Sequence, residues 1–207
     1  MKQHREGLLL VISGPAGVGK GTINAALLER NSDMRMSVSA TTRAPRPGEI
    51  EGLHYFFKTE EAFLRMIEDG EFLEYTRVFN MNYYGTPKSF VLDELAAGRS
   101  VILEIDVEGG MNVKRAYPDA VLIFIAPPSM NELQERLIGR NTETPEQIER
   151  RFKTAFSELE RAKGYDYVVI NEVIDVAVSR VERIISAERC RTARNRKFLD
   201  DLTGGMN

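Results

Sequence analysis

The sequence predicts an α/β protein with a central parallel sheet. Short apolar runs with the length of buried strands recur along the chain, at 8–12, 101–105, 121–125 and 167–170. Helical patterns lie between these runs, and the first run leads directly into a glycine-rich loop. Strands that alternate with helices favour a parallel sheet with helices on both faces. Since 207 residues can bury one sizeable core, we expect a single domain.

The expected elements follow one another in a regular order. The first run, LLLVI, is bounded by Gly7 and Gly14, which is typical of a fully buried parallel strand. The later strands read VILEI, VLIFI and YVVI. Four helical patterns accompany them: TINAALLER at 22–30, VLDELAAG at 91–98, MNELQERLIG at 130–139 and VIDVAVSRVERIISAER at 173–189.

Two stretches interrupt this alternation and are predicted to be insertions. The first, from about residue 37, is rich in turn formers and aromatic residues, with one helix at Glu60–Glu68. The second reads as two charged helices, the later one capped by Thr144 and begun by Pro145. The predicted division is a core of 1–36, 91–128 and 164–207, a first insertion of 37–90 and a second insertion of 129–163.

The composition argues against several classes of protein. A net charge of −3 disfavours binding to nucleic acid through a general positive surface. The single cysteine, Cys190, cannot form an internal disulfide and fits a reducing cytoplasm. No early apolar run approaches the roughly 20 residues of a membrane span. We therefore expect a soluble cytoplasmic protein without nucleic-acid or membrane partners, whose oligomeric state the sequence does not determine.

The glycine-rich loop has the spacing G-x-x-x-x-G-K. It follows the first strand and opens the first helix, which is the context that a phosphate-binding loop requires. Its backbone N–H groups and the helix dipole attract phosphate, and the lysine adds a point charge. An ordinary glycine-rich turn with a surface lysine is the alternative. The loop predicts the three-layer P-loop NTPase fold, with ATP-binding positions Gly14, Pro15, Ala16, Gly17, Val18, Gly19, Lys20, Gly21 and Thr22.

The residue after the loop lysine departs from the usual pattern. Gly21 stands where a hydroxyl residue commonly contacts Mg²⁺, and the hydroxyl comes one place later, at Thr22. Direct Mg²⁺ ligation by the loop is therefore in question, with Thr22 as the remaining candidate. The sequence GKGT resembles the loops of adenylate kinases and of some bacterial guanylate kinases, and it indicates a nucleotide kinase without naming the acceptor.

The first insertion offers a group of side chains suited to a dianionic monophosphate. Two guanidinium groups and three hydroxyl groups are available there. Taken singly, the arginines could belong to a solvated loop and the tyrosines to a small satellite core. The candidate residues are Ser39, Arg43, Arg46, Tyr55 and Tyr84.

Five motifs in order resemble those of guanylate kinases. Besides the phosphate loop, they are SVSATTRAPRPGEIEGLHYFF, FLEY, NYYGTPK and LEIDVEGG. The resemblance covers nearly the whole chain and implies transfer of the γ-phosphoryl group of ATP to GMP, with Mg²⁺ as cofactor and ATP and GMP as the small-molecule substrates. It also implies that the five residues of the first insertion hold the GMP phosphate.

The same resemblance assigns the guanine base to Glu74 and Thr86. Guanine presents N1–H and N2–H₂ donors, so a facing carboxylate accepts two hydrogen bonds, whereas it opposes a lone pair on adenine. A buried polar site of this kind can reject the wrong base by about 10⁴ or more. The alternation in EFLEYTRV also permits Glu74 to face outward from an edge strand.

Two acids follow the second core strand. Glu104 and Asp106 should point to one face at the carboxyl end of that strand, where open α/β sheets bind ligands. We expect Asp106 on the GMP side and Glu104 at Mg²⁺ through water, with the reverse assignment still open. The segment from Glu74 to Tyr84 is one residue longer than the family spacing, which predicts a bulged loop around Phe79-Asn80-Met81.

The second insertion resembles the lid on the ATP side. The family pattern implies that Arg140 and Arg151 face the phosphates, while Arg136 and Arg150 fit i, i+4 pairing with nearby glutamates. Asn171, after the last core strand, matches a position near adenine, although an asparagine there could instead cap the final helix.

Phosphoryl transfer depends on in-line positioning and on stabilisation of charge. A phosphate monoester with a second pKa of about 6 is mostly dianionic at neutral pH, so no general base is required. We expect Lys20, Arg43, Arg140, Arg151 and Mg²⁺ to act together. His4 and His54 need no catalytic role.

Three alternatives have different sequence signatures. A guanylate-kinase-like binding module that has lost catalysis should have a damaged phosphate loop, yet Gly14, Gly19 and Lys20 are present. A kinase for AMP is disfavoured by Glu74 and Thr86. A nucleic-acid or partner surface could use a basic run that reads more simply as a solvated helix face: Arg189, Arg191, Arg194, Arg196 and Lys197.

Overall fold

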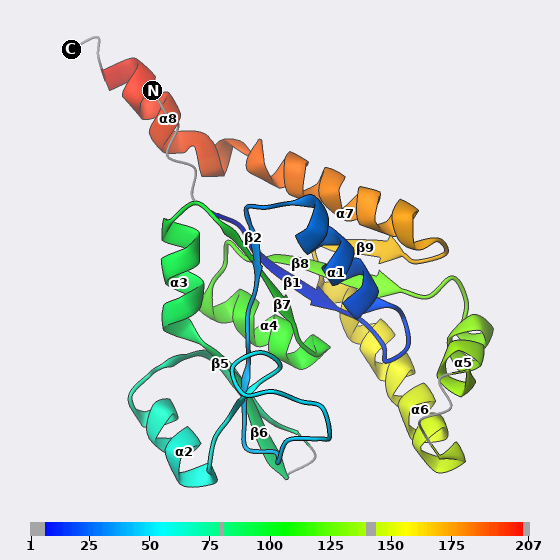
Figure 1. Ribbon diagram of the computed structural model, residues 1–207. Coiled ribbons are helices and arrows are strands. Elements are labelled where there is room, and N and C mark those ends of the chain that lie inside the picture. The colour runs from blue at the N-terminus through cyan, green and yellow to red at the C-terminus, as the bar shows by residue number, and fades with distance from the viewer. Residues whose placement is uncertain (1–6, 79–80, 140–143, 205–207) are drawn as a thin grey trace.

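The computed structural model describes residues 7–78, 81–139 and 144–204, and it confirms the central parallel sheet (Figure 1). Strands follow the order β2-β7-β1-β8-β9, and every pair in this sheet is parallel. Their bounds are Leu9–Ser13 (β1), Met34–Met36 (β2), Ser100–Glu104 (β7), Val121–Ala126 (β8) and Tyr167–Ile170 (β9). Because the strands are parallel, their carboxyl ends lie at one edge of the sheet.

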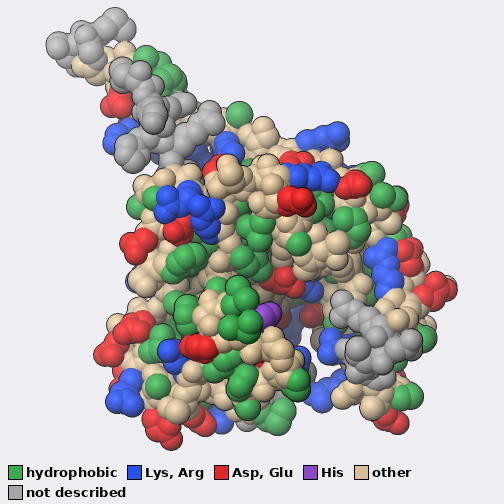
Figure 2. Space-filling view, in the orientation of Figure 1, with side chains coloured by type: hydrophobic (Ala, Val, Ile, Leu, Met, Phe, Trp, Pro, Cys, Tyr) green, Lys and Arg blue, Asp and Glu red, His purple; other side chains and the backbone are tan. Residues whose placement is uncertain are grey.

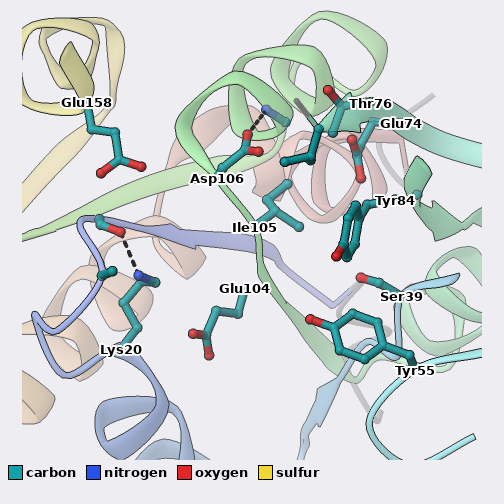
Figure 3. A pocket seen from close by; sticks show the side chains of 15 residues that line it. Lys20, Ser39, Tyr55, Glu74, Thr76, Tyr84, Glu104, Ile105, Asp106 and Glu158 are labelled. Atoms are coloured by element: carbon teal, nitrogen blue, oxygen red, sulfur yellow. Dashed lines mark hydrogen bonds between the residues drawn. The ribbon is translucent and has the colours of Figure 1, made fainter. Parts of the chain in front are cut away.

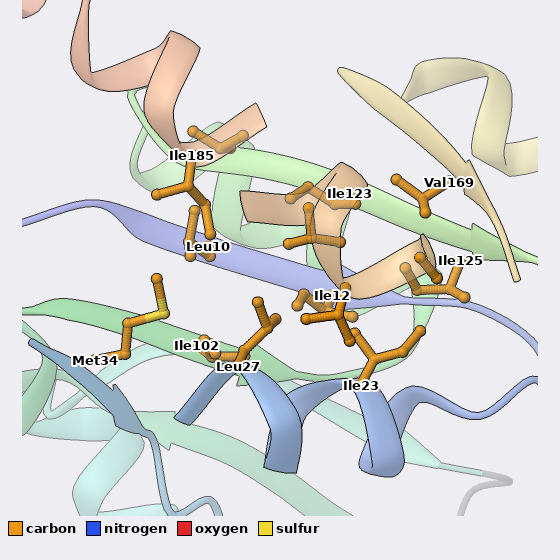
Figure 4. Close-up of a cluster of buried hydrophobic side chains, with 14 of the residues drawn as sticks. Leu10, Ile12, Ile23, Leu27, Met34, Ile102, Ile123, Ile125, Val169 and Ile185 are labelled. Carbon is orange, nitrogen blue, oxygen red and sulfur yellow. The ribbon is translucent and has the colours of Figure 1, made fainter. Parts of the chain in front are cut away.

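Helices cover both faces of this sheet. On one face, Leu10 and Ile12 of β1 pack with α1 (Lys20–Arg30) and α7 (Ile174–Arg189), as Figure 4 shows. On the other face, Leu9 and Val11 belong to a second buried cluster with residues of α3 (Lys88–Ala96) and α4 (Val107–Ala116). Strands buried on both faces explain the unbroken apolar runs of the sequence.

The first insertion forms a sheet of its own. Its order is β4-β3-β6-β5, with β3 at Ala40–Thr41, β4 at Phe56–Phe57, β5 at Phe72–Val78 and β6 at Asn82–Pro87. Helix α2 spans Glu60–Glu68, the predicted range. Phe63 of α2 is fully buried and stacks on Phe72 and Tyr83, with ring centroids 4.4 and 5.4 Å away. This aromatic stack attaches the helix to the small sheet.

The second insertion contains α5 (Met130–Ile138) and α6 (Pro145–Arg161), followed by the short turn η1 (Ala162–Gly164). Thr144 and Gln147 form the two reciprocal bonds of a capping box, and Pro145 begins the helix as predicted. Leu133, Leu137 and Ala155 bury the contact between the two helices.

Three elements of the core were not predicted from the sequence: β2, α4 and α8 (Arg196–Thr203), the last preceded by the turn η2 (Thr192–Asn195). Helix α4 contains Gly109 and Gly110, which lower helix propensity. It forms nonetheless because Asp106 caps its first turn and Val107 and Val113 are buried.

The basic run near the C-terminus is largely paired. Arg189 lies 2.6 Å from Asp33, while Arg191 and Arg194 contact the buried Glu188 at 3.4 and 3.1 Å. These ion pairs favour the interpretation as a structured helix face over a nucleic-acid surface. Among the helices that the structure describes, none combines the length and the apolar character of a membrane span.

Candidate active site

A cavity of about 330 Å³ lies at the carboxyl end of β1 and β7. Its wall combines the glycine loop, the first insertion, the end of β7 and one residue of α6. Figure 2 shows the molecule hollowed between the two insertions, with charged side chains inside the hollow. Residues that are far apart in sequence therefore meet at the edge of the sheet where α/β proteins bind ligands.

The glycine loop adopts the conformation that its sequence requires. Gly17 and Gly19 have φ values of 86° and 97°, in the left-handed region that favours glycine. Lys20 Nζ donates to the carbonyl oxygens of Gly14 and Pro15, at 2.6 and 3.2 Å, and Lys20 lines the cavity. The loop glycines and the lysine thus lie at the start of α1, where helix N-termini bind phosphate.

Asn171 lies directly beneath this loop. It is buried, and its Nδ2 donates to the carbonyl oxygen of Val18 at 2.8 Å. A Cβ atom at Gly19 would come within 2.6 Å of the same nitrogen. Arg136 donates to the carbonyl oxygen of Asn171 at 3.0 Å and pairs with Glu132. Asn171 therefore supports the loop, and Arg136 has the structural pairing that was expected of it.

The position after the lysine is open. A Cβ atom at Gly21 would meet no atom of the described residues within 4 Å, and Thr22 beside it is exposed. Nothing in the packing of the described chain excludes a side chain at position 21.

Glu74 and Thr86 form a buried pair on neighbouring strands. They lie opposite each other in the β5–β6 register, and Thr86 Oγ1 donates to Glu74 Oε1 at 2.8 Å. Glu74 is 7% exposed and faces the cavity, so the outward-facing alternative does not apply. Burial raises the pKa of Glu74 to about 7, the hydrogen bond from Thr86 opposes this shift, and the charge of Asp106 adds to it.

The five candidate phosphate ligands are only partly assembled. Ser39, Tyr55 and Tyr84 line the cavity (Figure 3). Arg43 lies behind them, with Nε donating to Tyr84 Oη at 3.2 Å and its guanidinium 5.3 Å from the centre of the Tyr55 ring. The side chain of Arg46 is exposed and lies outside the cavity wall.

Arg43 is also held by Glu49. Its Nη2 donates to Glu49 Oε1 at 2.8 Å, and the backbone N–H of Arg46 donates to Glu49 Oε2 at 2.7 Å. These bonds lower the pKa of Glu49 to about 2, with the Arg43 hydrogen bond as the main cause. Glu49 thus fixes the loop that carries both arginines.

The acids at the end of β7 and in the loop that follows it point to different parts of the cavity. Glu104 Oε2 accepts a hydrogen bond from Asn24 Nδ2 at 2.7 Å, and in Figure 3 it lies on the side of Lys20. Asp106 caps α4 by accepting from the N–H of Gly109 at 2.7 Å, and it lies on the side of Glu74. This arrangement favours the expected division between a metal-side and a base-side carboxylate.

The lid arginines are only partly within the described chain. Arg140 lies outside the described residues, as do Phe79 and Asn80 of the expected bulge. Arg151 is exposed on α6, next to Arg150. In the parts of the chain that the structure describes, no three His, Cys, Asp or Glu side chains form a group that could hold a metal by themselves.

Several residues that line the cavity, or that hold a lining residue, were missed in the sequence. Asn24 follows Lys20 by four residues and Glu158 follows Arg151 by seven, spacings that place each pair on one helix face. That periodicity could have found both. Glu158 lines the cavity from α6, and burial raises its pKa while Lys20 opposes the shift. Thr76 was missed although it shares a strand face with Glu74.

Comparisons with known proteins agree with this geometry. The family model described as guanylate kinase matches residues 6–188. A guanylate kinase of Caldanaerobacter subterraneus subsp. tengcongensis is 53% identical over 95% of each chain, and one of Clostridioides difficile is 46% identical over 94% of this chain and 95% of its own. The crystal structure of guanylate kinase from Anaplasma phagocytophilum superposes with a TM-score of 0.76 at 36% identity, over 95% of each chain. With the P-loop fold, the cavity and these relatives in agreement, the chain belongs to the guanylate kinase family.

Proposed function

We propose that this protein transfers the γ-phosphoryl group of ATP to GMP, giving ADP and GDP in purine nucleotide metabolism. Membership of the family implies ATP-dependent phosphorylation of GMP. The observation that carries the proposal for this chain is the buried Glu74–Thr86 pair, in which Glu74 lines the same cavity as Lys20.

Base recognition follows from the chemistry of this pair. An ionised Glu74 accepts hydrogen bonds from N1–H and N2–H₂ of guanine, and Thr86, whose hydroxyl donates to Glu74 Oε1, holds that carboxylate in place. Adenine offers an unprotonated N1 to the same carboxylate, so a buried charge would be left unpaired. The desolvation that raises the pKa of Glu74 also strengthens the hydrogen bonds that it forms with the correct base.

The subsites divide between the two insertions. The first, 37–90, is the GMP-binding insertion, in which Ser39, Tyr55 and Tyr84 hold the acceptor phosphate together with Arg43 and Arg46. The second, 129–163, is the lid over ATP. The phosphate loop at 14–22 binds the ATP phosphates, and Asn171 supports the loop near the adenine end.

Transfer needs no general base in this proposal, because GMP arrives largely as the dianion. Lys20 neutralises charge on the transferred phosphoryl group, and Arg43, Arg140 and Arg151 stabilise the charge that spreads over its equatorial oxygens. Closure of the insertion and the lid excludes water, which protects ATP from hydrolysis.

The side chains present fit Mg²⁺. This ion commonly keeps several waters and takes one or two carboxylates together with substrate phosphates. Glu104, held by Asn24 on the Lys20 side of the cavity, is the carboxylate that would reach the metal through water, and Thr22 is the candidate hydroxyl of the loop. When bound, the ion would neutralise negative charge on the substrate phosphates.

The test is a balanced product assay. Protein incubated with ATP, GMP and Mg²⁺ should form ADP and GDP in equal amounts, as measured by chromatography. Removal of the metal with EDTA and the substitution Lys20→Ala should each abolish GDP formation. ADP that appears without matching GDP would identify an ATPase and contradict the proposal.

A further inference from the structure

Tyr165 occupies the junction between the lid helix and the catalytic loops. It follows directly on η1, the turn that ends α6, and its hydroxyl donates to Ser13 Oγ at 2.8 Å. Ser13 is the last residue of β1 and immediately precedes the phosphate loop. A residue 152 positions away is thus joined to the base of that loop.

The Ser13 hydroxyl also bonds the acidic loop at residues 104–106. Ser13 is fully buried, and its Oγ donates to the carbonyl oxygen of Ile105 at 2.8 Å. The carbonyl oxygen of Asp106 also lies within hydrogen-bond distance of Ser13 Oγ, at 3.3 Å. Tyr165 Oη also lies 3.4 Å from the carbonyl oxygen of Val107. Two hydroxyl groups therefore hold the phosphate loop, the loop after β7 and the end of α6 in one relative position.

Helix α4 is shaped around the Tyr165 hydroxyl. A Cβ atom at Gly110 would stand 2.1 Å from Tyr165 Oη, closer than any real Cβ contact. This close approach explains a glycine inside a helix, where glycine is otherwise unfavourable. Burial raises the pKa of Tyr165 well above its usual range, so the hydroxyl keeps its proton at neutral pH.

We propose that Tyr165 is a positioning residue for phosphoryl transfer: through Ser13 it holds the acidic loop at 104–106 against the phosphate loop, and it ties both to the lid helix. The inference rests on the proposed function, because it concerns the same transfer. It assigns Tyr165 no contact with substrate. Misplacement by about 1 Å can cost about 10²-fold in rate, so a displaced loop is expected to show in kcat.

The experiment compares two tyrosines on either side of one residue. Tyr165→Phe removes only the hydroxyl that joins the loops. Tyr167→Phe is the matched control, because it removes a hydroxyl that donates to Glu188 Oε1 at 2.7 Å and does not line the cavity. We expect Tyr165→Phe to lower kcat about ten-fold or more while KM for GMP stays within about two-fold. Tyr167→Phe should lower Tm and leave kcat unchanged.

A second readout does not depend on turnover. Hydrogen exchange should accelerate at the amides of Gly109 and Gly110, which bond Asp106, in Tyr165→Phe and not in Tyr167→Phe. The wild-type rate with GMP tests the proposed function separately. A failure of the proposed function can therefore be told apart from a failure of the Tyr165 inference. Should Tyr165→Phe not fold, Ser13→Ala is tested by the same two criteria.

A double-mutant cycle of Tyr165 and Gly110 gives the sharpest test of the inference. Gly110→Ala forces a methyl group onto the hydroxyl, so it should lower kcat in the wild type. Its effect should be smaller in the Tyr165→Phe background, where the nearest remaining atoms are the ring Cζ at 3.1 Å and Val11 Cγ1 at 3.2 Å. A kcat of Tyr165→Phe within about two-fold of wild type, unchanged exchange at both glycines, or additive effects in the cycle would overturn the inference.

Discussion

At Glu74, the burial of the carboxylate and its recognition of guanine depend on each other. A carboxylate that is 7% exposed has lost most of its water, and within the described chain it accepts a hydrogen bond from the Thr86 hydroxyl. Such a group is costly when unpaired and strongly bound when a ligand supplies matching donors. Guanine supplies two matching donors. The desolvation that makes the unpaired carboxylate costly in the empty site therefore also makes the site selective for guanine.

Replacement of Glu74 by Gln distinguishes recognition of the guanine base from binding of the ATP phosphates. The amide offers one acceptor and places N–H₂ against a guanine donor, so kcat/KM for GMP should fall at least about 100-fold. KM for ATP should barely change, because the phosphate loop is untouched. Steady-state kinetics with each substrate varied in turn measures both. An unchanged rate with GMP would remove Glu74 from base recognition.

The raised pKa of Glu74 predicts a pH dependence of activity. The carboxyl must be ionised to accept two hydrogen bonds, and its pKa is about 7. As the pH falls below that value, kcat/KM for GMP should decline by about tenfold per unit. Thr86→Val removes the hydrogen bond that lowers this pKa and should shift the midpoint upward. A profile that is flat between pH 6 and 8 would contradict the assignment.

The same pKa predicts the pH dependence of stability. The folded pKa of about 7 lies above the ordinary value of 4.5, so the folded state binds the extra proton between these values. The contribution of Glu74 to stability is then greatest below about pH 4.5 and decreases as the pH rises to about 7. Glu74→Gln removes this decrease in stability, because the amide does not titrate. Thermal unfolding should therefore show a Tm advantage of the variant that grows from pH 5 to pH 8, and a constant difference would refute it.

Sequence reasoning identified most of the cavity residues but not their supports. Lys20, Glu74, Glu104 and Asp106 come from motifs with fixed spacing, so their chemistry could be read directly. The spacing from Lys20 could place Asn24 on the same face of α1, but it could not reveal the hydrogen bond of Asn24 to Glu104, 80 positions away. Pairings of that kind depend on how α1 packs across β7, which residue types alone do not specify.

At the scale of elements, the core strands and flanking helices were predicted because apolar runs and helical periodicity report burial directly. Helix α4 was missed for a physical reason. Its two glycines depress helix propensity, and the benefit of Gly110 lies in a contact with Tyr165 that is distant in sequence. Strand β2 was missed because three residues are too few for a period to show.

The glycine at position 21 offers a test of the metal shell. Gly21→Ser introduces the hydroxyl that phosphate loops usually place on Mg²⁺, in space that the described chain leaves open. We expect the variant to fold with equal or greater stability, since glycine within a helix costs about 0.5–1 kcal/mol. The Mg²⁺ concentration for half-maximal activity should fall. Gly21→Ala is the control for helix propensity alone, and equal Mg²⁺ dependence in both variants would contradict a metal role.

At the scale of the whole molecule, the two insertions face each other across the cavity (Figure 2). The candidate phosphate ligands are incompletely gathered: Arg43 is held by Glu49 behind the wall, and Arg46 is exposed. A closing movement of the insertions would bring them to the substrates. The acidic net charge is no obstacle to phosphate binding, because the cations are placed locally.

Closure can be measured between the two insertions. The exposed single cysteine allows a Cys190→Ser background, with labels at Glu68→Cys on α2 and Lys153→Cys on α6. The distance distribution between spin labels should shorten when an ATP analogue and GMP bind together, and less with either one alone. An identical distribution in all four states would show that the insertions do not close.

The most direct measurement is the choice of acceptor. Purified protein receives ATP and Mg²⁺ with GMP, AMP, CMP or UMP in turn, and kcat/KM is determined for each from the release of ADP. Guanine recognition by the buried Glu74–Thr86 pair predicts that GMP exceeds each of the other three by about 10⁴. Release of ADP no faster with GMP than with AMP would contradict it.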